Sequence, residues 1–353
     1  MFAQVHHPQV LDPEVLDHYL SQGWFRMGQT IFTTNFLTFN EHLYGAIWLR
    51  VSLKEFKPTK TQSKLLKSNI AFNIKISEAS ITPEKEILFD RYKQCISFEA
   101  SPSLHNLFYG KSFHNIYNTH EVTVCDGDNL IAVGYFDVGA TSAAGIASFY
   151  DPAYKKYSLG NYMMFLKMDY CSKMGLQYFY PGYFVPGYSF FDYKLKINNS
   201  VLQYLEFHSQ QWKAIGSFHP AVCPLNVMQD KLHTLQINMA EAKVASKILK
   251  YVFYDANLFP DFIEAELFDF PLFLYCFEMI DDQIHPIIIY DASVSKYRLV
   301  RCKQVWKSNL PNRADETYSS YLLKIEEDLF STESSEEMVT TLLRLKHAYI
   351  TLR

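Results

Sequence analysis

The fold of this chain is decided by residues 148–187, SFYDPAYKKYSLGNYMMFLKMDYCSKMGLQYFYPGYFVPG. The stretch begins at the end of a strand, and a polar turn leads from there to residues 158–174, which have the length of a helix. Gly175 then supplies the left-handed residue with which many helices end. The aromatic residues 177–183 that follow are typical of a half-buried strand. The stretch therefore predicts the order strand, loop, helix, strand.

Strands also precede this loop and helix. Glu121–Cys125, Leu130–Asp137 and Gly145–Tyr150 alternate or run apolar, and an Asp-Gly turn or small residues separate them. An antiparallel meander followed by a loop, a long helix and another strand is the order of a GNAT-type acyltransferase core. We therefore expect an α+β fold with a mostly antiparallel sheet and flanking helices. We expect it to form two GNAT-like lobes and a C-terminal extension.

The rest of the chain is assigned by the same patterns of apolar spacing and turn residues. In the N-terminal part we expect a helix, two strands and a second helix near Pro13–Gln22, Gly28–Phe39, Gly45–Ser52 and Pro83–Phe98. Later we expect a helix, three strands and an amphipathic helix at Met239–Phe253, Leu272–Ile280, Pro286–Asp291, Tyr297–Val305 and Ser334–Arg353. These assignments predict an N-terminal region (1–75), a GNAT-like core (76–200) and a C-terminal α/β extension (201–353).

Composition bears on the compartment and on cofactors. Of the 353 residues, 48% are hydrophobic, which is ample for a large buried core. The net charge of −4 gives no overall basic field, so any contact with nucleic acid must be local. The six cysteines form no CxxC pair, which indicates scattered reduced thiols, and we expect no metal site and no cofactor. We find no signal peptide and no apolar run of membrane length, so we expect a cytoplasmic protein without membrane contact.

The loop before the long helix has the chemistry of an anion site. Lys155 and Lys156 give it positive charge, Ser158 suits the N-cap position, and Gly160 would allow close approach to the backbone. A helix N-terminus placed there could hold a phosphate-bearing acyl donor. The loop lacks the glycine-rich turn expected for coenzyme A, which favours another phosphate-bearing donor. The alternative is that both lysines are solvated loop residues.

The strand after the helix is rich in aromatic residues. Between Tyr178 and Tyr193, nine of sixteen residues are aromatic. Most should pack in the core, but tyrosine hydroxyls need partners when they are buried. Tyr180 and Tyr183 stand where a cleft would open, so we expect one or two of these rings to line a pocket. Stacking on a base there would contribute about 1–3 kcal/mol.

A second basic element lies at KEFKPTKTQSKLLK, residues 54–67. If Pro58 begins a helix, the spacing places four lysines on one face, namely Lys57, Lys60, Lys64 and Lys67. This lysine stripe is either a solubilising surface or a contact for a phosphate backbone.

Together these motifs resemble the aminoacyl-tRNA–protein transferases, that is, the arginyltransferases and the related bacterial leucyltransferases. The resemblance is clearest over Leu130–Lys194, in LIAVGYFDV, SFYDP, SLGNY, GLQYFYPGY and FDYK, where the family has LxAVGxxDV, FYDP, SLGxY, GLPYxYLGY and MxYK. A weaker match covers GWFR at 23–26, LRV at 49–51 and FKPTKTQ at 56–62. In all, the resemblance spans about Leu16–Lys196, over half of the chain.

The resemblance implies a double GNAT-like fold and a transfer reaction. The enzyme would move an aminoacyl group, arginine in the first place and leucine in the second, from tRNA to the N-terminal amine of a protein. The partners would be aminoacyl-tRNA, as co-substrate, and proteins or peptides that begin with Asp or Glu.

This hypothesis gives roles to particular residues. Lys155, Lys156, Ser158, Gly160 and Lys194 would hold the donor, and the lysine stripe would follow the tRNA backbone. Tyr180 or Tyr183 would stack on the terminal adenosine or polarise the ester carbonyl. Arg50 would bind the acidic side chain of the acceptor, because a guanidinium pairs bidentately with a carboxylate. Asp137 would orient the incoming amine, unless it merely caps a bulge in its strand.

The sequence departs from the family at several positions. In place of the cysteine cluster CxxCxxC it has Asn40, Leu43 and Ala46, so we expect no metal, haem or iron–sulfur role of that cluster here. Pro181 replaces the leucine of YLGY, and Asn199 replaces the proline that ends the YKxxFxP motif. These changes keep a second hypothesis open. In it the chain is a GNAT-fold relative that acts as a different acyltransferase or as a binding or regulatory module.

Overall fold

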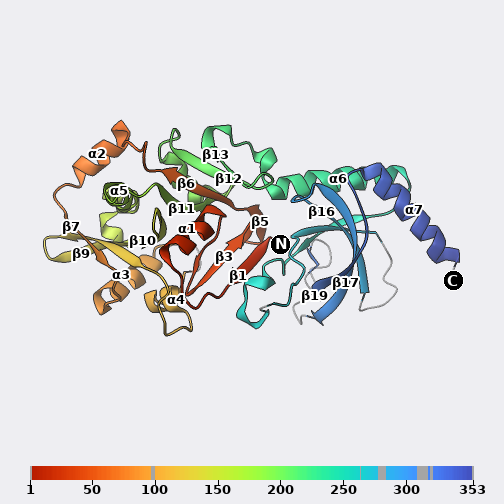
Figure 1. Cartoon of the computed structure of the whole chain (residues 1–353), viewed down its shortest axis with the longest axis horizontal. Helices are drawn as coiled ribbons and strands as arrows, with labels where there is room; N and C mark the ends of the chain where they lie inside the picture. Colours follow the sequence, from red (N-terminus) through yellow and green to blue (C-terminus); the bar gives the residue numbers. More distant parts are fainter. Residues whose placement is uncertain are drawn as a thin grey trace.

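The computed structural model describes residues 2–96, 100–262, 264–276, 284–307, 317–318 and 321–351. Two large β-sheets lie along the long axis of the molecule, one formed by the first part of the chain and one by the last (Figure 1). Both are accompanied by helices, so the α+β fold class is confirmed.

The first sheet has eight strands in the order β13-β12-β6-β11-β10-β9-β8-β7. Along the chain, the strands are β6 (Ile47–Ser52), β7 (Asn73–Glu78), β8 (Thr119–Asp126), β9 (Asn129–Val138), β10 (Ser142–Tyr150), β11 (Tyr178–Phe184), β12 (Leu202–Glu206) and β13 (Gln211–Ala214). The predicted meander is confirmed, because β8, β9 and β10 pair antiparallel in sequence order.

Helices cover both faces of this sheet. α5 (Leu159–Lys173) packs on one face, and its buried residues join the main core beneath β8 and β9. α3 (Pro83–Lys93) and α4 (Leu104–Tyr109) pack on the other face, over Val133 and Tyr135. The order β7, α3, α4, β8, β9, β10, α5, β11 is that of a GNAT-like core, which confirms the expected fold. Gly175 ends the α5 segment with a φ of +80°, as the sequence indicates.

The strands β10 and β11 form the one parallel pair in the described part of this sheet, and they soon separate. Their register extends only from Ser142 opposite Tyr178 to Ala144 opposite Tyr180. Beyond that point each strand has an irregularity: β10 shifts register with β9 between Gly145 and Ala147, and β11 shifts with β6 between Phe179 and Gly182. Bulges of this kind bend a strand and end its pairing. The two strands therefore diverge toward the N-terminus of α5.

Pro181 lies inside the β11 bulge. Proline has no N–H to give to a neighbouring strand, and bulges are among the few strand positions that accept it. The extra residue also changes which side chains share a face. Tyr178, Tyr180 and Tyr183 all pack on one side of the sheet, while Phe179 and Phe184 pack in the core on the other.

Smaller elements cover the tyrosine face of the sheet. They are α1 (Pro13–Ser21), a three-stranded sheet of β1 (Ala3–His6), β3 (Thr30–Thr34) and β2 (Phe25–Met27), and the hairpin of β4 (Phe36–Phe39) and β5 (His42–Gly45). α2 (Lys60–Ser68) carries the lysine stripe and begins at a capping box, in which Thr59 and Gln62 exchange side-chain and backbone hydrogen bonds.

The second sheet has six strands in the order β18-β14-β15-β16-β17-β19. They are β14 (Lys247–Tyr251), β15 (Leu272–Tyr275), β16 (Ile284–Asp291), β17 (Lys296–Lys307), β18 (Thr317–Tyr318) and β19 (Tyr321–Thr332). Its helices are α6 (Pro224–Glu241), which packs on this sheet, and α7 (Ser335–Thr351), which packs on α6 (Figure 1). The three predicted strands and the terminal helix are present. The ends of the predicted segments Pro83–Phe98, Leu272–Ile280 and Ser334–Arg353 lie outside the described residues.

The predicted helix at Met239–Phe253 is wrong. The helix of this region, α6, has already ended at Glu241, and Lys247–Tyr251 forms strand β14. The strand is favoured because it pairs with β15 and buries Leu249 and Tyr251, which alternate as a strand requires. Tertiary pairing here outweighs local helix propensity.

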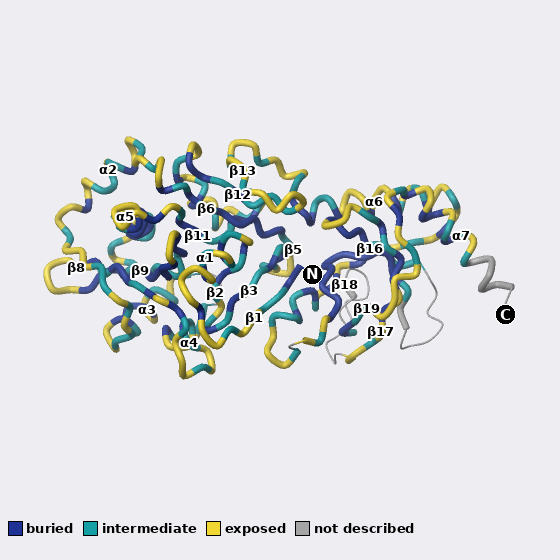
Figure 2. Tube along the Cα trace, viewed as in Figure 1, coloured by how far each residue is buried: buried dark blue, intermediate teal, exposed yellow. Residues whose placement is uncertain are grey.

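One hydrophobic core joins the two sheets. Buried residues continue from Met163 under the first sheet to Ile288 in the second, as the dark segments of Figure 2 indicate. The beginning of the chain is held at the same junction, because the Phe2 and Ala3 backbone N–H groups both donate to the buried carboxylate of Asp269. The division into parts 1–75, 76–200 and 201–353 stays a prediction, and the first sheet takes strands from all three of them. No helix of the described chain is long and apolar enough to cross a membrane.

Candidate functional site

The gap between β10 and β11 has tyrosines on both sides. Tyr150, the last residue of β10, packs on Tyr92 of α3, with ring centroids 5.5 Å apart. On the other side, Tyr183 of β11 packs on Phe191, with centroids 5.2 Å apart. Tyr193 lies on this β11 side as well, because its ring centroid is 5.8 Å from Lys194 Nζ, which donates to the Tyr183 carbonyl. Burial raises the pKa of Tyr193 to about 12. The place where β10 and β11 separate, called the opening below, is the candidate functional site.

The N-terminus of α5 lies beside this opening. Ser158 stands at the N-cap position, but its backbone is left-handed, with φ 51°, and its side chain accepts no hydrogen bond from the helix. Ser158 is thus the N-cap residue, as predicted, but its side chain does not cap the helix, because such a bond is normally made from an extended backbone. The first N–H groups of α5 therefore have no side-chain cap, and such groups bind anions well.

Gly160 is not required by packing. A Cβ atom added to it would lie 3.7 Å from Cε1 of Tyr150, which is an ordinary contact. Among the residues that the structure describes, therefore, nothing demands glycine here, and the predicted reason for it, close approach of a ligand, stays a prediction.

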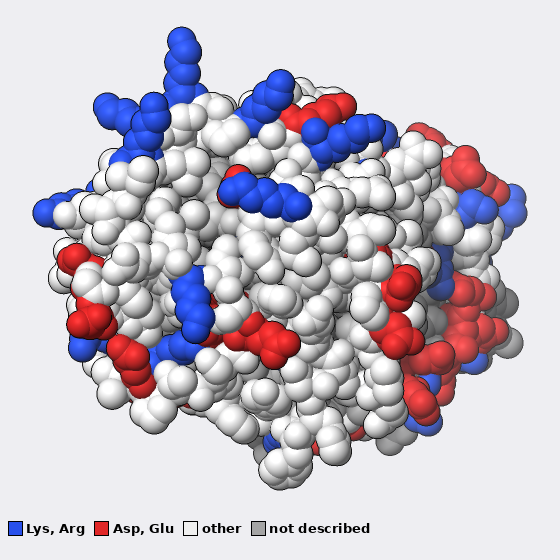
Figure 3. All heavy atoms as spheres, turned by 60° about the vertical axis from the view of Figure 1, so that its left-hand side comes forward, with Lys and Arg blue, Asp and Glu red and all other residues white. Residues whose placement is uncertain are grey.

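The structure brings the two basic elements of the sequence together. Lys155 and Lys156 are exposed in a 3₁₀ turn, Pro152–Tyr157, just before α5. The end of α2 packs against that turn: Asn69 Nδ2 donates to the Tyr157 carbonyl over 3.0 Å, and Phe72 packs on the Tyr157 ring. Lys and Arg gather along the upper edge of Figure 3, the side on which α2 lies in Figure 1. The two elements therefore form one basic surface.

All four lysines of the stripe are exposed, namely Lys57, Lys60, Lys64 and Lys67. Lys57 precedes α2, and the other three lie on the helix itself. None of them forms an ion pair with a carboxylate of the described residues. An uncompensated row of lysines attracts phosphate, although it serves solubility as well.

The two predicted tyrosines have different environments. Tyr180 is 1% exposed and packs edge-on against Trp212 and Phe25, and burial raises its pKa to about 12. Its ring therefore has no open face for a base. Burial raises the pKa of Tyr183 to about 12 as well, but its side chain is partly exposed and packs on Phe191, so it is the better placed of the two.

Lys194 lies next to Tyr183, but inside the protein. Its Nζ donates to the Tyr183 carbonyl over 2.7 Å and lies 5.0–5.8 Å from the ring centroids of Tyr183, Phe191 and Tyr193. Burial lowers the pKa of Lys194 to about 7. This amine is held by the Tyr183 carbonyl and the surrounding rings, and its predicted contact with the donor stays a prediction.

Arg50 is a half-buried cation without a carboxylate partner in the described part of the chain. Its Nε donates to Gln203 Oε1 over 2.7 Å, and its guanidinium lies between the rings of Tyr178 and Trp212, 4.2 and 4.6 Å from their centroids. The two aromatic faces and the amide stabilise the group without neutralising it. The arrangement is one that a carboxylate ligand would complete.

Asp137 does not share this environment. It is 1% exposed, accepts a hydrogen bond from Thr119 Oγ1 over 2.6 Å, and pairs with Arg26 Nη1 at 3.0 Å. Burial raises its pKa, against the opposing effects of Arg26 and Thr119. Arg26 in turn donates to the carbonyls of Gly28 and Phe108. Sequence reasoning missed this pair, because no local pattern connects residues 26 and 137.

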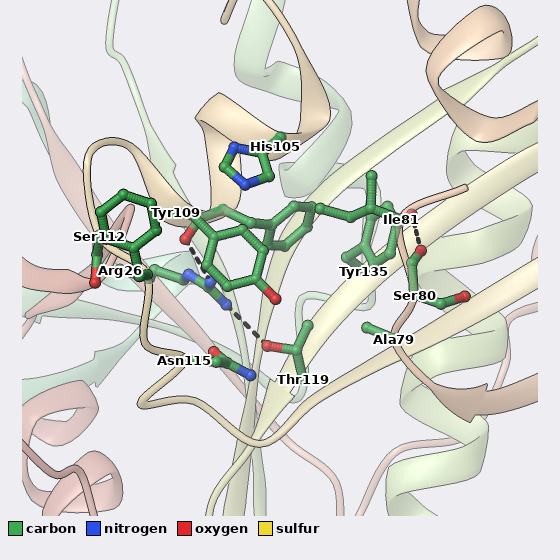
Figure 4. A pocket seen from close by; sticks show the side chains of 12 residues that line it. Arg26, Ala79, Ser80, Ile81, His105, Tyr109, Ser112, Asn115, Thr119 and Tyr135 are labelled. Atoms are coloured by element: carbon green, nitrogen blue, oxygen red, sulfur yellow. Dashed lines mark hydrogen bonds between the residues drawn. The ribbon is translucent and has the colours of Figure 1, made fainter. Parts of the chain in front are cut away.

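A cavity of about 420 Å³ opens beside Arg26, between α4 and the start of β8 (Figure 4). Its polar lining is mostly uncharged and includes Ser80, Tyr109, Asn115 and Thr119. The one cation in the lining, Arg26, is neutralised by Asp137. None of the predicted site residues lines this cavity, and it adds no charged group to the opening described above.

Lys167 is a second buried lysine that sequence reasoning missed. It projects from α5 to the β10 bulge, where its Nζ lies 2.9 Å from the Tyr135 carbonyl, 3.1 Å from the Ala147 carbonyl and 2.9 Å from Ser148 Oγ. Gly134 makes room for it, since a Cβ there would lie 2.7 Å from Lys167 Cε. Burial lowers the pKa of Lys167 to about 7. A lysine in the apolar run MMFLKM could have signalled an inward-pointing amine.

This pKa gives a pH-dependent stability. The folded protein loses the Lys167 proton near pH 7, whereas the unfolded chain keeps it up to the ordinary pKa of 10.5. The unfolded state therefore binds more protons between these values, and stability rises with pH across this window. In urea unfolding at pH 7, 8 and 9, Lys167→Met should remove up to about 1.4 kcal/mol per pH unit from that rise. Lys173→Met, on the exposed face of the same helix, should leave this rise of stability with pH intact. If the wild type and both variants gave parallel plots of unfolding free energy against pH, the lowered pKa of Lys167 would be contradicted.

The residues at the family's cysteine positions do not fit a metal group. Asn40 stands in a left-handed turn between β4 and β5, Leu43 is half-buried, and Ala46 is buried. None of the three offers a thiolate. Within the described ranges no three His, Cys, Asp or Glu side chains gather as a set of metal ligands.

Part of this chain is similar in sequence to known transferases. Residues 84–204 match the family model described as arginine-tRNA-protein transferase, C terminus. An aspartate/glutamate leucyltransferase of Leptospira interrogans is 29% identical over 192 residues, which cover 53% of this chain and 73% of that protein. The enzyme of the same name from Paracoccus denitrificans is 26% identical over 217 residues, 57% of this chain and 74% of its own.

Among solved structures, FemX aligns with 53% of this chain and 64% of its own, at 8% identity and a TM-score of 0.33. That likeness is too weak to support any statement about function. The family match and the sequence relatives carry the assignment, and they cover α3, α4, α5 and the diverging strands at which the candidate site lies. Over about half of its length, this chain is similar in sequence to the aminoacyl-tRNA–protein transferases, a family of acyl-transferring enzymes.

Proposed function

We propose that this protein transfers leucine or arginine from aminoacyl-tRNA to the N-terminal amine of proteins that begin with Asp or Glu. The names of the sequence relatives favour leucine, and the name of the matching family model favours arginine. The observation that carries the proposal is the opening between β10 and β11. It combines an uncapped helix N-terminus, an uncompensated basic surface and half-buried aromatic rings.

The reaction needs little chemical help from the protein. The acceptor amine attacks the ester carbonyl, a C–N bond forms, and the C–O bond to the ribose breaks as that oxygen takes up a proton. The ester is already activated, and an α-amino group with an ordinary pKa near 7.7–8.0 is partly unprotonated at neutral pH. Holding the two groups together can then supply several kcal/mol of the barrier.

On the donor side, we assign phosphate contacts to the first turn of α5 and to Lys155, Lys156 and the lysine stripe. The uncapped N–H groups and the exposed ammonium groups support this assignment. Tyr183 would lie against the terminal adenosine or the ester. On the acceptor side, Arg50 would bind the acidic side chain, which its uncompensated charge supports.

The direct test supplies tRNA charged with labelled leucine or arginine together with peptides that begin with Asp, Glu or Ala. Label should pass to the Asp and Glu peptides from one of the two donors. Transfer from neither donor, together with no binding of charged tRNA, would support the other hypothesis, in which this relative is a different acyltransferase or a binding module. The departures at Pro181 and Asn199 are the sequence features in favour of that hypothesis.

The lysine stripe can be tested by charge reversal. In the variant Lys60→Glu/Lys64→Glu, charged tRNA should bind at least tenfold more weakly. Each lost phosphate contact should also reduce the slope of log affinity against log salt by about 0.7–0.9. Lys250→Glu, an exposed lysine of β14, is the control and should change neither quantity. An unchanged salt slope in the double variant would remove the stripe from the proposal.

A further inference from the structure

Six aromatic side chains form a ledge beside the opening. They come from the β4–β5 hairpin and from the 3₁₀ helix Ser189–Lys196 with the residue before it, and we call them the aromatic ledge: Phe39, Tyr44, Tyr188, Phe190, Phe191 and Tyr193. Phe39 and Tyr188 stack with centroids 4.8 Å apart and planes 10° from parallel. Tyr44 packs on Tyr188 at 5.5 Å, and Phe39 on Phe191 at 5.8 Å.

The ledge is not part of the closed core. Phe190 is 42% exposed and Tyr193 is 38% exposed, although the Tyr193 hydroxyl is buried enough to raise its pKa. Tyr188 and Phe39 are half-buried, whereas Tyr180 in the eight-stranded sheet is 1% exposed. An exposed aromatic cluster of this kind is uncommon on a soluble protein unless it binds something.

The ledge connects the opening with the lysine stripe. At one end, Phe191 packs on Tyr183 of β11. At the other end, the 3₁₀ helix reaches α2, where Gln62 Nε2 donates to the Lys196 carbonyl over 3.2 Å. The chain just beyond it meets the start of the stripe, since the Asn198 amide donates to the Lys57 carbonyl. From Phe190 to Lys196 the 3₁₀ rise amounts to about 12 Å. Rings and lysines thus form one continuous surface.

The positive charge of this surface favours a ligand that carries phosphates. Lys196 is exposed at the α2 end of the ledge, and four further exposed lysines follow on the stripe. Asp192 and Glu41 are the exposed carboxylates of the segments that form the ledge, so the phosphates must lie toward the lysines. Exposed rings beside a row of lysines are typical of surfaces that bind single-stranded nucleic acid, with bases on the rings and phosphates on the cations.

We propose that the aromatic ledge binds the unpaired 3′-terminal nucleotides of the donor tRNA by stacking, and so leads the ester to Tyr183. This inference rests on the proposed function and assigns a place to the end of its donor. It differs from the sequence-based hypothesis, in which Tyr180 was a stacking residue, because the Tyr180 ring is enclosed.

Equilibrium binding of charged tRNA tests the ledge without any measurement of transfer. Tyr193→Leu keeps apolar bulk but removes an aromatic face, and it should weaken binding roughly 5- to 150-fold, the range for one lost stack. Tyr188→Ala/Tyr193→Leu should weaken it further. The control is Phe113→Leu, since Phe113 is 95% exposed on the loop before β8 and belongs to neither surface. Asp192→Asn should tighten binding, because it removes a negative charge from the path of the phosphates.

Uncharged tRNA with and without its unpaired 3′ nucleotides provides a second comparison, because a tRNA that lacks these nucleotides cannot carry the ester. The wild type should bind this shortened tRNA about as weakly as the double variant does, and the variant should show no further loss. A tRNA with 2-aminopurine at its 3′-terminal position reports stacking directly. Its fluorescence should fall when it binds the wild type and should fall less when it binds Tyr193→Leu. Because the signal comes only from bound tRNA, it also distinguishes a lost stack from a fraction of unfolded variant.

Several results would overturn the inference. One is a double variant that binds intact tRNA as the wild type does, and another is a variant that weakens intact and shortened tRNA equally. If the variants raise the KM for the acceptor peptide and leave tRNA binding unchanged, the ledge binds peptide instead. A wild type that binds no charged tRNA at all would contradict the proposed function itself, which separates the two failures.

Discussion

Replacing Asp137 by alanine is expected to lower the free energy of unfolding by about 3–5 kcal/mol. The substitution leaves the Arg26 guanidinium, whose side chain is only 3% exposed, without its carboxylate. The remaining partners, Thr119 and the carbonyls of Gly28 and Phe108, hold the arginine in place but do not neutralise it. Urea unfolding of the two proteins measures the difference.

Two further variants separate charge from packing. Asp169→Ala breaks an exposed pair with Lys173 and should cost less than about 1 kcal/mol. Arg26→Met/Asp137→Leu replaces both charges by apolar groups and should recover much of the lost stability. The rate of aminoacyl transfer by the folded fraction of Asp137→Asn shows whether Asp137 also orients the acceptor amine. An unchanged rate would mean that Asp137 has only a structural role. A rate lowered 100-fold or more would support its predicted role with the amine.

Replacing Arg50 by methionine is expected to lower kcat/KM about 30- to 150-fold for a peptide that begins with Asp. This range corresponds to the loss of a charge-assisted hydrogen bond worth about 2–3 kcal/mol. Methionine keeps the apolar contact with Tyr178 and Trp212, so stability should change far less than in Asp137→Ala. Lysine should not restore activity, because it offers neither the planar stack nor the bidentate geometry of arginine.

Substrate choice gives the control for this prediction. If Arg50 binds the acidic side chain, the wild type should prefer Asp to Asn at the first position of the peptide, and Arg50→Met should lose that preference. Arg301→Met, at an exposed arginine that pairs with Glu327 in the second sheet, should change neither activity nor preference. If Arg50→Met slowed transfer to every acceptor peptide equally, Arg50 would maintain the structure of β6 and would not bind the acidic side chain.

The central fold could be predicted from sequence because its signals are local. The alternation in β8, the apolar run of β9, the Asp-Gly turn between them and Gly175 after α5 each lie within a few residues of the structure they specify. Lys247–Tyr251 could not be assigned in the same way, because its strand is stabilised by β15, which is distant in sequence. The eight-stranded order was also out of reach, since no local pattern indicates that β6 pairs with β11 and β12.

The candidate site was predicted in part for the same reason. The loop lysines, the lysine stripe and Tyr183 were found from composition and spacing, and the structure brings them to one region. The sequence could not show which of two arginines, Arg26 or Arg50, is neutralised by a carboxylate. Arg26 is neutralised by Asp137, which is far away along the chain, and Arg50 is not neutralised by any carboxylate of the described residues. Burial likewise distinguishes Tyr180 from Tyr183, although both stand in one short aromatic segment.

The position of β6 in the first sheet has a consequence for how the chain folds. β6 is synthesised early, yet both of its neighbours, β11 and β12, come much later in the chain. Contacts between segments so far apart are slow to form, because the loop between them must close first. Until Glu206 has been made, β6 has an unpaired edge, and Trp48 and Leu49 on it are exposed to other chains. Newly made protein should therefore aggregate when synthesis outruns folding, and a slower rate of expression should raise the soluble yield.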